Sequence, residues 1–162
     1  MKFEDSKDLY KEIAPNGYRI RGYFINEVIV IARLMDRHIV KHFTDDADKQ
    51  MELIELFIST KRVSFEGKRQ AFKAIVDKYY PTRFKDKDKI YANLKKIEDL
   101  RNILAHNILD TRQEAVESIK NGVIGFLSFH NESILITYNK DEIENFKTII
   151  KDLQKELFDG MV

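Results

Sequence analysis

A chain of 162 residues with 43% hydrophobic content can bury one core but not two comfortable ones, so residues 1–162 are predicted to form a single domain. The absence of cysteine excludes a disulfide framework and a thiolate metal site. The N-terminus carries acids throughout, which excludes a signal peptide, and the longest apolar run, residues 28–32, is far too short to span a membrane. We therefore expect a cytoplasmic protein with no membrane partner.

The net charge of +1 hides an uneven distribution along the chain. Residues 61–96 hold twelve Lys or Arg against four acids, whereas the remainder holds sixteen bases and twenty-three acids. The same segment is rich in Phe and Tyr, so it could follow a phosphate backbone and stack unpaired bases. The alternative is that these lysines are simply solvated and that most of the aromatic rings belong to the core.

Helical periodicity dominates the first two thirds of the chain. The cluster Pro15-Asn16-Gly17 predicts a turn that ends a first short helix, and the residue before Pro81 is expected to end another. The second helix is apolar all round its middle and should be the most buried. The predicted helices are Asp5–Ile13, Tyr18–Phe43, Ala47–Ser59, Glu66–Tyr80 and Asp86–Asn107.

The last third of the chain follows a different pattern. A capping box that starts at Thr111 predicts a short helix to Lys120, although Asn121-Gly122 also suits a hairpin turn. Two runs of strand formers then predict a β-hairpin, and a helical period returns after it. These elements are the strands Val123–Phe129 and Ser133–Tyr138 and a closing helix Lys140–Phe158 capped by Asn139. The predicted fold class is mainly α, an antiparallel helical bundle with a small C-terminal β-hairpin.

One arginine interrupts an apolar stripe on the fifth of these helices. The stripe recurs at steps of four and three residues and consists of Ile90, Leu94, Ile97, Arg101, Leu104 and Ile108. An unpaired buried charge is costly, so Arg101 is expected to have a counter-ion, a ligand or a partner chain. Asn102 and His106 lie four residues apart and so on one face of the same helix end. A guanidinium, an amide and an imidazole together suit a phosphodiester.

The run Arg101-Asn102-Ile103-Leu104-Ala105-His106 resembles the motif of the HEPN superfamily, in which an arginine, a polar residue, a short spacer and a histidine close an α-helix. The resemblance implies an all-α bundle and a homodimer whose two motifs face one RNA cleft. It also implies a metal-independent endoribonuclease without a cofactor, in which Arg101 and His106 are catalytic and Asn102 is an accessory polar residue. The family's toxin and defence members often act with an antitoxin or companion protein.

The reaction expected from these groups is attack of a ribose 2′-OH on the adjacent phosphorus, which leaves a 2′,3′-cyclic phosphate. His106 would act as general acid or base, and Arg101 would neutralise charge on the phosphorane oxygens. In a straight helix these two side chains point about 140° apart. Either the helix breaks near Ala105, or the arginine reaches across the two-fold axis of a dimer.

Two other pairs in the chain have the same interval of four residues between arginine and histidine, Arg33 with His38 and Arg37 with His42. Both are weaker matches, because Arg33 precedes an apolar residue and Arg37 is expected on a solvated helix face. The dipeptide Arg37-His38 still satisfies a loose form of the motif. His38 and His42 are also spaced to hold a metal from one helix face, but no third ligand is evident and no metal site is expected.

The predicted counter-ion of Arg101 is Glu27, a carboxylate inside the apolar run of the central helix, which would orient the guanidinium. Asp36 and Asp99 are the rival acids, and Glu98 is expected on an exposed face. A second function also fits the sequence, a HEPN-like dimer that has no catalysis and serves as a binding or assembly module. One minimal group of the family has a tyrosine at the position of Ile108, so that group's type of partner is not implied here.

Overall fold

The computed structural model describes residues 3–59, 63–110, 112, 115, 117–118, 121–128 and 134–161, with side chains from residue 15 onward. Of the described residues, 74% are helical, and a small three-stranded antiparallel sheet lies near the C-terminal end of the chain. The mainly α class is therefore confirmed. The chain divides into two compact units, residues 1–26 with 99–148 and residues 27–98 with 149–162. The predicted single domain stays a prediction.

The first helix, α1, runs without a break from Phe3 to Phe43 and has Pro15 inside it. The predicted turn at Pro15-Asn16-Gly17 is wrong. A proline inside a helix removes one hydrogen bond and crowds the preceding turn, but tertiary packing can outweigh this local preference. Gly17 is buried against Leu109, whose side chain would overlap a Cβ at position 17. The glycine therefore permits a close contact and does not end the helix.

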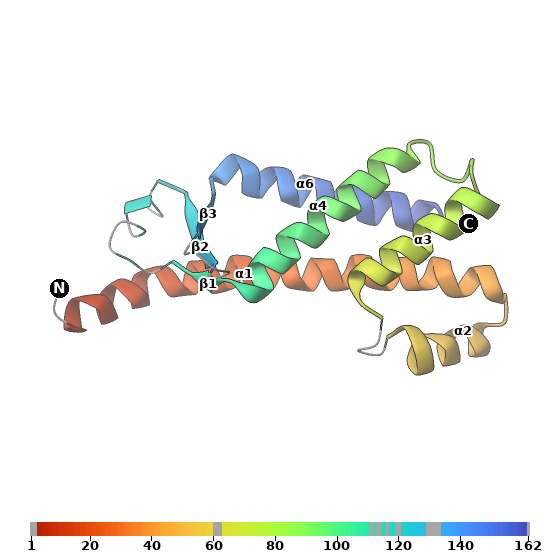
Figure 1. Ribbon diagram of the computed structural model, residues 1–162, viewed down its shortest axis with the longest axis horizontal. Coiled ribbons are helices and arrows are strands. Elements are labelled where there is room, and N and C mark those ends of the chain that lie inside the picture. The colour runs from red at the N-terminus through yellow and green to blue at the C-terminus, as the bar shows by residue number, and fades with distance from the viewer. Residues whose placement is uncertain are drawn as a thin grey trace. The chain divides into compact units, whose positions relative to one another are not determined.

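The second unit contains the later part of α1, then α2 (Ala47–Leu53), the π-helical segment η1 (Ile54–Ile58) and α3 (Phe65–Tyr79). Figure 1 shows α2 running back beneath the end of α1. Asp46 caps α2 by accepting hydrogen bonds from two backbone N–H groups, and Ser64 caps α3 through Gly67 N. The predicted helices Ala47–Ser59 and Glu66–Tyr80 are confirmed to within two residues.

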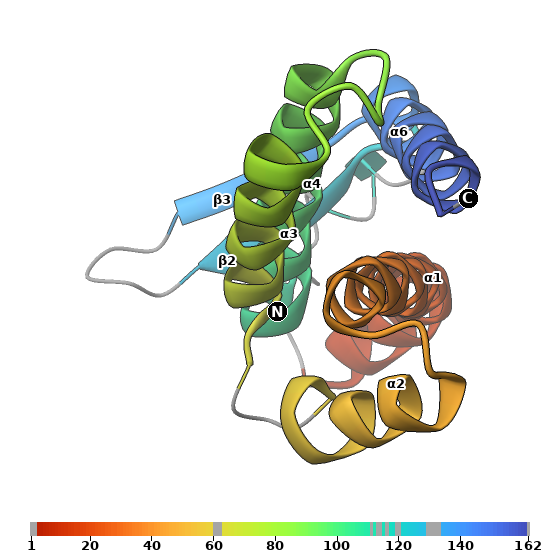
Figure 2. The same ribbon diagram turned by 90° about the vertical axis from the view of Figure 1, so that its right-hand side faces the viewer.

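Helices α4 (Lys87–His106) and α6 (Lys140–Asp159) each contribute a part to this second unit. Figure 2 shows this part of α1 end-on, between α2 on one side and α6 on the other. His38 Nε2 donates a hydrogen bond to the Leu157 carbonyl at 2.7 Å, which ties α1 to α6. The core of this unit includes eight side chains that have no solvent exposure, Ile31, Met35, Val40, Phe72, Leu94, Ile97, Ile150 and Leu157.

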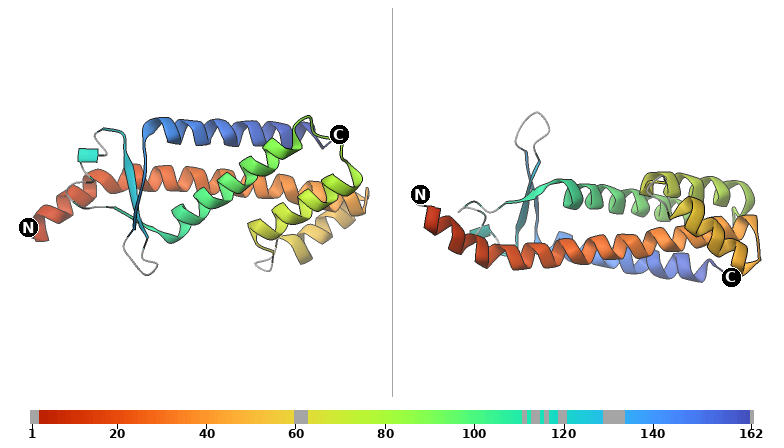
Figure 3. Two further views of the ribbon diagram at one scale, coloured as in Figure 1. Left: turned by 45° about the horizontal axis from the view of Figure 1, so that its top comes forward. Right: turned by 90° about the horizontal axis from the view of Figure 1, so that it is seen from below.

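The first unit joins the early part of α1 to the end of α4, to the sheet and to the start of α6. The sheet has the order β1-β2-β3, with β1 (Ile108–Leu109), β2 (Ile124–Ser128) and β3 (Ile134–Tyr138) antiparallel to their neighbours. The predicted hairpin is confirmed as β2 and β3, which run side by side in Figure 3. Strand β1 was not predicted, because only its long-range pairing with β2 makes these two residues a strand.

Register places one row of this sheet in the core and the next row outside. Leu109, Phe126 and Ile136 are cross-strand neighbours, and the first two are fully buried against the helices. Ile108 and Leu135, in the other row, are 61% and 45% exposed. The sheet therefore has an inner face that packs and an outer face that keeps apolar side chains in contact with solvent.

The predicted helix Thr111–Lys120 falls largely outside the described residues. Within it Ala115, Glu117 and Ser118 are helical, and Gly122 follows with a φ of 76°. Val123 N donates to the Ser118 carbonyl at 2.8 Å, so Gly122 provides the left-handed turn after a helical segment. The predicted cap of α6 is confirmed, because Asn139 and Glu142 exchange reciprocal hydrogen bonds between side chain and backbone.

Candidate functional site at the end of helix α4

The three predicted site residues Arg101, Asn102 and His106 lie in the last turns of α4, in the first unit. Arg101 is half-exposed, and its Nη1 donates a hydrogen bond to Asn102 Oδ1 at 3.1 Å. The expectation of a buried guanidinium is wrong. The stripe itself is confirmed at Ile90, Leu94, Ile97 and Leu104, which are buried. Since Arg101 reaches solvent and its neighbour's amide, its charge requires no buried counter-ion.

Helix α4 stays intact through the motif. The Asn107 backbone N–H donates to the Ile103 carbonyl at 3.0 Å, so the helix ends only after His106. The option of a break near Ala105 is therefore wrong. Asn102 and His106 share one exposed face, whereas Arg101 lies about 140° away from His106 around the helix axis. Within one chain, the imidazole and the Arg101 guanidinium do not converge.

His106 borders a hollow of about 320 Å³. Its walls come from Tyr18 and Arg21 of α1 and from the residues that lead from His106 into β1. His106 is exposed, so its ring is accessible to a ligand in this hollow. The structure thus places an imidazole beside a guanidinium that the sequence analysis did not select.

That guanidinium belongs to Arg21, which is half-buried at the wall of the hollow. Its Nη2 donates to the Asn107 carbonyl at 2.6 Å, and its guanidinium carbon lies 5.5 Å from the centre of the Phe126 ring. Its Nε is buried, and no residue of the described chain accepts a hydrogen bond from it. A sequence signal existed, because Arg21 interrupts a stripe of α1 just as Arg101 interrupts one of α4. The stripe is Gly17, Arg21, Phe24, Val28, Ile31 and Met35.

The competing histidines have structural partners. His38 is 4% exposed, donates to the Leu157 carbonyl and packs edge-on against Phe72 and Phe84. Burial lowers the pKa of His38 and so favours the neutral form of its ring. His42 Nδ1 lies 3.1 Å from the hydroxyl of Tyr80. These contacts leave Arg37-His38 without a histidine that a substrate could reach.

The acids considered as partners of Arg101 have other contacts. Glu27 Oε2 accepts a hydrogen bond from Gln154 Nε2 at 2.6 Å, and Asp36 Oδ2 accepts one from Lys68 Nζ at 2.6 Å. Asp99 is exposed, and its charge contributes, after burial and Glu142, to a raised pKa of Tyr138. The Glu27–Arg101 pair stays a prediction, because its two members belong to different units.

One expectation about exposure is wrong. Glu98 is 5% exposed rather than solvated, and its Oε2 accepts a hydrogen bond from Arg69 Nε of α3 at 2.7 Å. Both side chains are largely buried, at 15% and 7% exposed. Charge on the inner side of α4 is therefore possible in the second unit because α3 provides the counter-ion.

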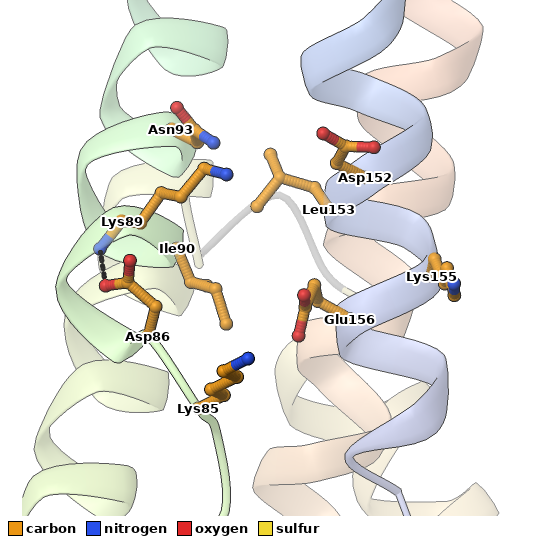
Figure 4. A pocket seen from close by; sticks show the side chains of 9 residues that line it. All are labelled: Lys85, Asp86, Lys89, Ile90, Asn93, Asp152, Leu153, Lys155 and Glu156. Atoms are coloured by element: carbon orange, nitrogen blue, oxygen red, sulfur yellow. Dashed lines mark hydrogen bonds between the residues drawn. The ribbon is translucent and has the colours of Figure 1, made fainter.

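A larger cavity of about 500 Å³ lies in the second unit between α4 and α6 (Figure 4). Its charged side chains are three lysines and three acids, so it has no net preference for either sign. Asp86 Oδ1 accepts a hydrogen bond from Lys89 N, which caps the start of α4. All six charged residues are exposed, so none of them marks a buried binding group. They are Lys85, Asp86, Lys89, Asp152, Lys155 and Glu156.

Within the described residues, no three His, Asp or Glu side chains gather closely enough to hold a metal ion. Over the same residues, no helix combines the length and the apolar content needed to cross a membrane. Comparison with known proteins gives no match to a family model, to a curated protein or to a solved structure.

Proposed function

We propose that this protein is a metal-independent endoribonuclease of the HEPN type, with its active site at the end of α4. The observation that carries the proposal is the exposed His106 at the mouth of a hollow that also contains Arg21, in a segment that resembles the family's motif. An accessible imidazole can accept or donate a proton and so suits general acid or base catalysis. The HEPN-like form of the bundle is part of the same proposal.

In the proposed reaction, His106 accepts the proton of the ribose 2′-OH as this oxygen attacks phosphorus, or donates a proton to the departing 5′-oxygen. Arg21 lies in the same chain and the same hollow, where its guanidinium would face a phosphodiester beside His106. Asn102 offers an exposed amide on the His106 face of the helix. The products are a 2′,3′-cyclic phosphate and a 5′-hydroxyl.

Arg101 enters this site from a second copy of the chain. Because α4 is unbroken, Arg101 and His106 of one chain face different directions, and a two-fold dimer would bring the Arg101 of one chain toward the His106 of the other. Such a dimer also supplies two imidazoles, so that one can act as base and the other as acid.

The test is cleavage of single-stranded RNA by purified protein in EDTA, with the ends of the products analysed. The expected result is a 2′,3′-cyclic phosphate from RNA and no cleavage of DNA, which lacks the 2′-OH. His106→Ala should lower the rate by about 10²–10⁴-fold. The control is Lys151→Ala, an exposed residue of α6 outside both the proposed site and the basic segment 61–96, which should cleave at the wild-type rate. Cleavage that persists in His106→Ala, or that needs a divalent metal, contradicts the mechanism.

A second candidate function is a binding or assembly module without catalysis. It is favoured by the outer face of the sheet, where Ile108 and Leu135 are exposed, and by the hydrogen bond that already occupies the Arg101 guanidinium. In this function the partner is a companion protein or antitoxin. No cleavage of a varied RNA pool, together with a stable dimer, would favour it over the nuclease.

A further inference from the structure

The second unit contains a smaller pocket that the proposed nuclease does not use. It has a volume of about 270 Å³ and lies between α1 and the segment formed by α2 and η1. Arg33, Asp36 and Arg37 line it from α1, Met51 and Ile54 line it from the opposite side, and Ser59 follows η1. The five-residue π-helical segment forms part of this wall, and such segments occur frequently at functional sites.

Asp36 provides an unused hydrogen-bond acceptor in this pocket. Its side chain is 4% exposed, and Oδ2 is bound to Lys68 Nζ at 2.6 Å. Oδ1 is buried, and no donor from the described residues binds it. Burial raises the pKa of Asp36, and the hydrogen bond and charge of Lys68 offset that rise only in part. A buried acceptor without a donor is costly and uncommon, which indicates a group that is completed by a ligand.

The mouth of the pocket carries the opposite charge. Arg33 and Arg37 are one helical turn apart, and both are exposed. Over the described part of the chain, neither guanidinium forms a hydrogen bond or an ion pair. The charge of Arg33 is near enough to Asp36 to act on its pKa. The pocket thus has two exposed guanidinium groups, of Arg33 and Arg37, at its mouth and the buried carboxylate of Asp36, paired with Lys68, in its interior.

These groups restrict the chemistry of a ligand. Since Lys68 already neutralises Asp36, a second ammonium group beside it would be repelled, and a neutral hydroxyl is the better donor to Oδ1. Two guanidinium groups one turn apart suit a phosphate monoester, which carries three acceptor oxygens and a charge of about −1.5 to −2 at pH 7. Met51 and Ile54 offer apolar surface to the C–H groups of a ring.

We infer that this pocket binds a small sugar phosphate, with its phosphate on Arg33 and Arg37 and a hydroxyl group donating to Asp36 Oδ1. The binding is independent of the proposed nuclease, because none of its groups belongs to the unit that holds His106.

The test is isothermal titration calorimetry of the full chain with ribose 5-phosphate, and with ribose and inorganic phosphate as its two halves. Ribose 5-phosphate should bind with one site per chain and at least about tenfold tighter than either half, because only the whole ligand reaches both ends of the pocket. Equal affinity for ribose 5-phosphate and inorganic phosphate overturns the inference, as does the absence of binding at about millimolar concentration.

Three variants locate the site. Arg33→Gln and Arg37→Gln should each weaken ribose 5-phosphate by about tenfold or more, the loss expected for a charged hydrogen bond. Asp36→Asn keeps one oxygen for Lys68 and turns the other position into a donor, so ribose 5-phosphate should bind no tighter than inorganic phosphate. The arginine variants change exposed residues and keep the test decisive where Asp36→Asn does not fold.

The controls are Arg19→Gln, an exposed arginine elsewhere on α1, and His106→Ala. Both should bind ribose 5-phosphate like the wild type. Unchanged affinity in Arg33→Gln and Arg37→Gln overturns the site, and a loss in His106→Ala that equals theirs does the same. Binding without RNA cleavage would support this pocket while contradicting the nuclease, so the two proposals fail separately.

Discussion

Two arginine–histidine pairs with the same spacing have opposite surroundings in this protein. In α1, His38 is buried and bonded to the Leu157 carbonyl, with aromatic rings against it. In α4, His106 is exposed at the edge of a hollow. Spacing along a helix is thus the same in both places, and only burial and partners separate a structural histidine from an accessible one. Burial and partners also distinguish the ion pairs of the second unit, where Lys68–Asp36 and Arg69–Glu98 are buried and each charge faces its counter-ion.

The largest expected effect tests whether those buried charges are structural. Lys68→Met leaves the Asp36 carboxylate buried without its counter-ion and should lower the free energy of unfolding by about 3–5 kcal/mol. Lys73→Met on the same helix removes an ion pair to Asp77 that is largely exposed, so the loss of unfolding free energy should be much smaller. Urea unfolding measures both. Similar losses would mean that burial does not distinguish the two pairs.

The next effect separates the two histidines directly. His38→Ala removes a buried hydrogen bond and leaves a cavity among aromatic rings, so it should lower the free energy of unfolding by about 2–4 kcal/mol. His106→Ala should change it by less than about 0.5 kcal/mol, because the ring is exposed. Equal urea midpoints for His38→Ala and His106→Ala would contradict the structural role assigned to His38.

Arg21 gives a smaller effect within the first unit. Arg21→Gln removes the charged hydrogen bond to the Asn107 carbonyl and should lower the free energy of unfolding by about 1.5 kcal/mol. Thermal or urea unfolding beside Arg19→Gln, an exposed position on the same helix, provides the measurement and its control. A loss no greater than that of Arg19→Gln would show that the contact adds nothing to the fold.

The smallest effect is the pH dependence that comes from His38. Burial holds its pKa below the ordinary value of 6.5, so the unfolded chain takes up a proton more readily than the folded one. This contribution is complete above about pH 6.5 and is lost as the pH falls from there toward the folded pKa. The unfolding free energy of wild type should therefore fall more between about pH 7 and pH 5 than that of His38→Gln. Parallel pH profiles would assign the fall to other groups.

Most of the secondary structure could be predicted from the sequence, because the helical period and the strand formers are local signals. The exceptions have non-local causes. The passage of α1 through Pro15 depends on packing, and β1 exists only because Ile108 and Leu109 pair with β2. Nothing in the run Ile54–Ile58 distinguishes a π-helical turn from an α-helical one.

The candidate site was predicted less completely, since periodicity identifies a face of a helix but not what covers it. Arg101 lies on the predicted stripe yet is half-exposed, whereas Glu98 lies off the stripe yet is buried because Arg69 pairs with it. His106 and Asn102 were identified from the motif and are accessible. Arg21 was not predicted although it breaks a stripe by the same rule, because the turn predicted at Pro15-Asn16-Gly17 divides that stripe between two predicted helices.

The close contact between Gly17 and Leu109 couples the side chains that these two positions can accept. Its Cα lies under the Leu109 side chain, so even a methyl group at position 17 would need that leucine to move. Alanine or serine at position 17 should therefore occur where the Leu109 side chain can shift, and more readily alongside a smaller side chain at position 109. Natural or laboratory-selected sequences that share this arrangement should show the two positions varying together. A library randomised at both positions should recover two kinds of sequence. One has glycine at position 17 with leucine at position 109, and the other has a larger residue at position 17 with alanine or valine at position 109.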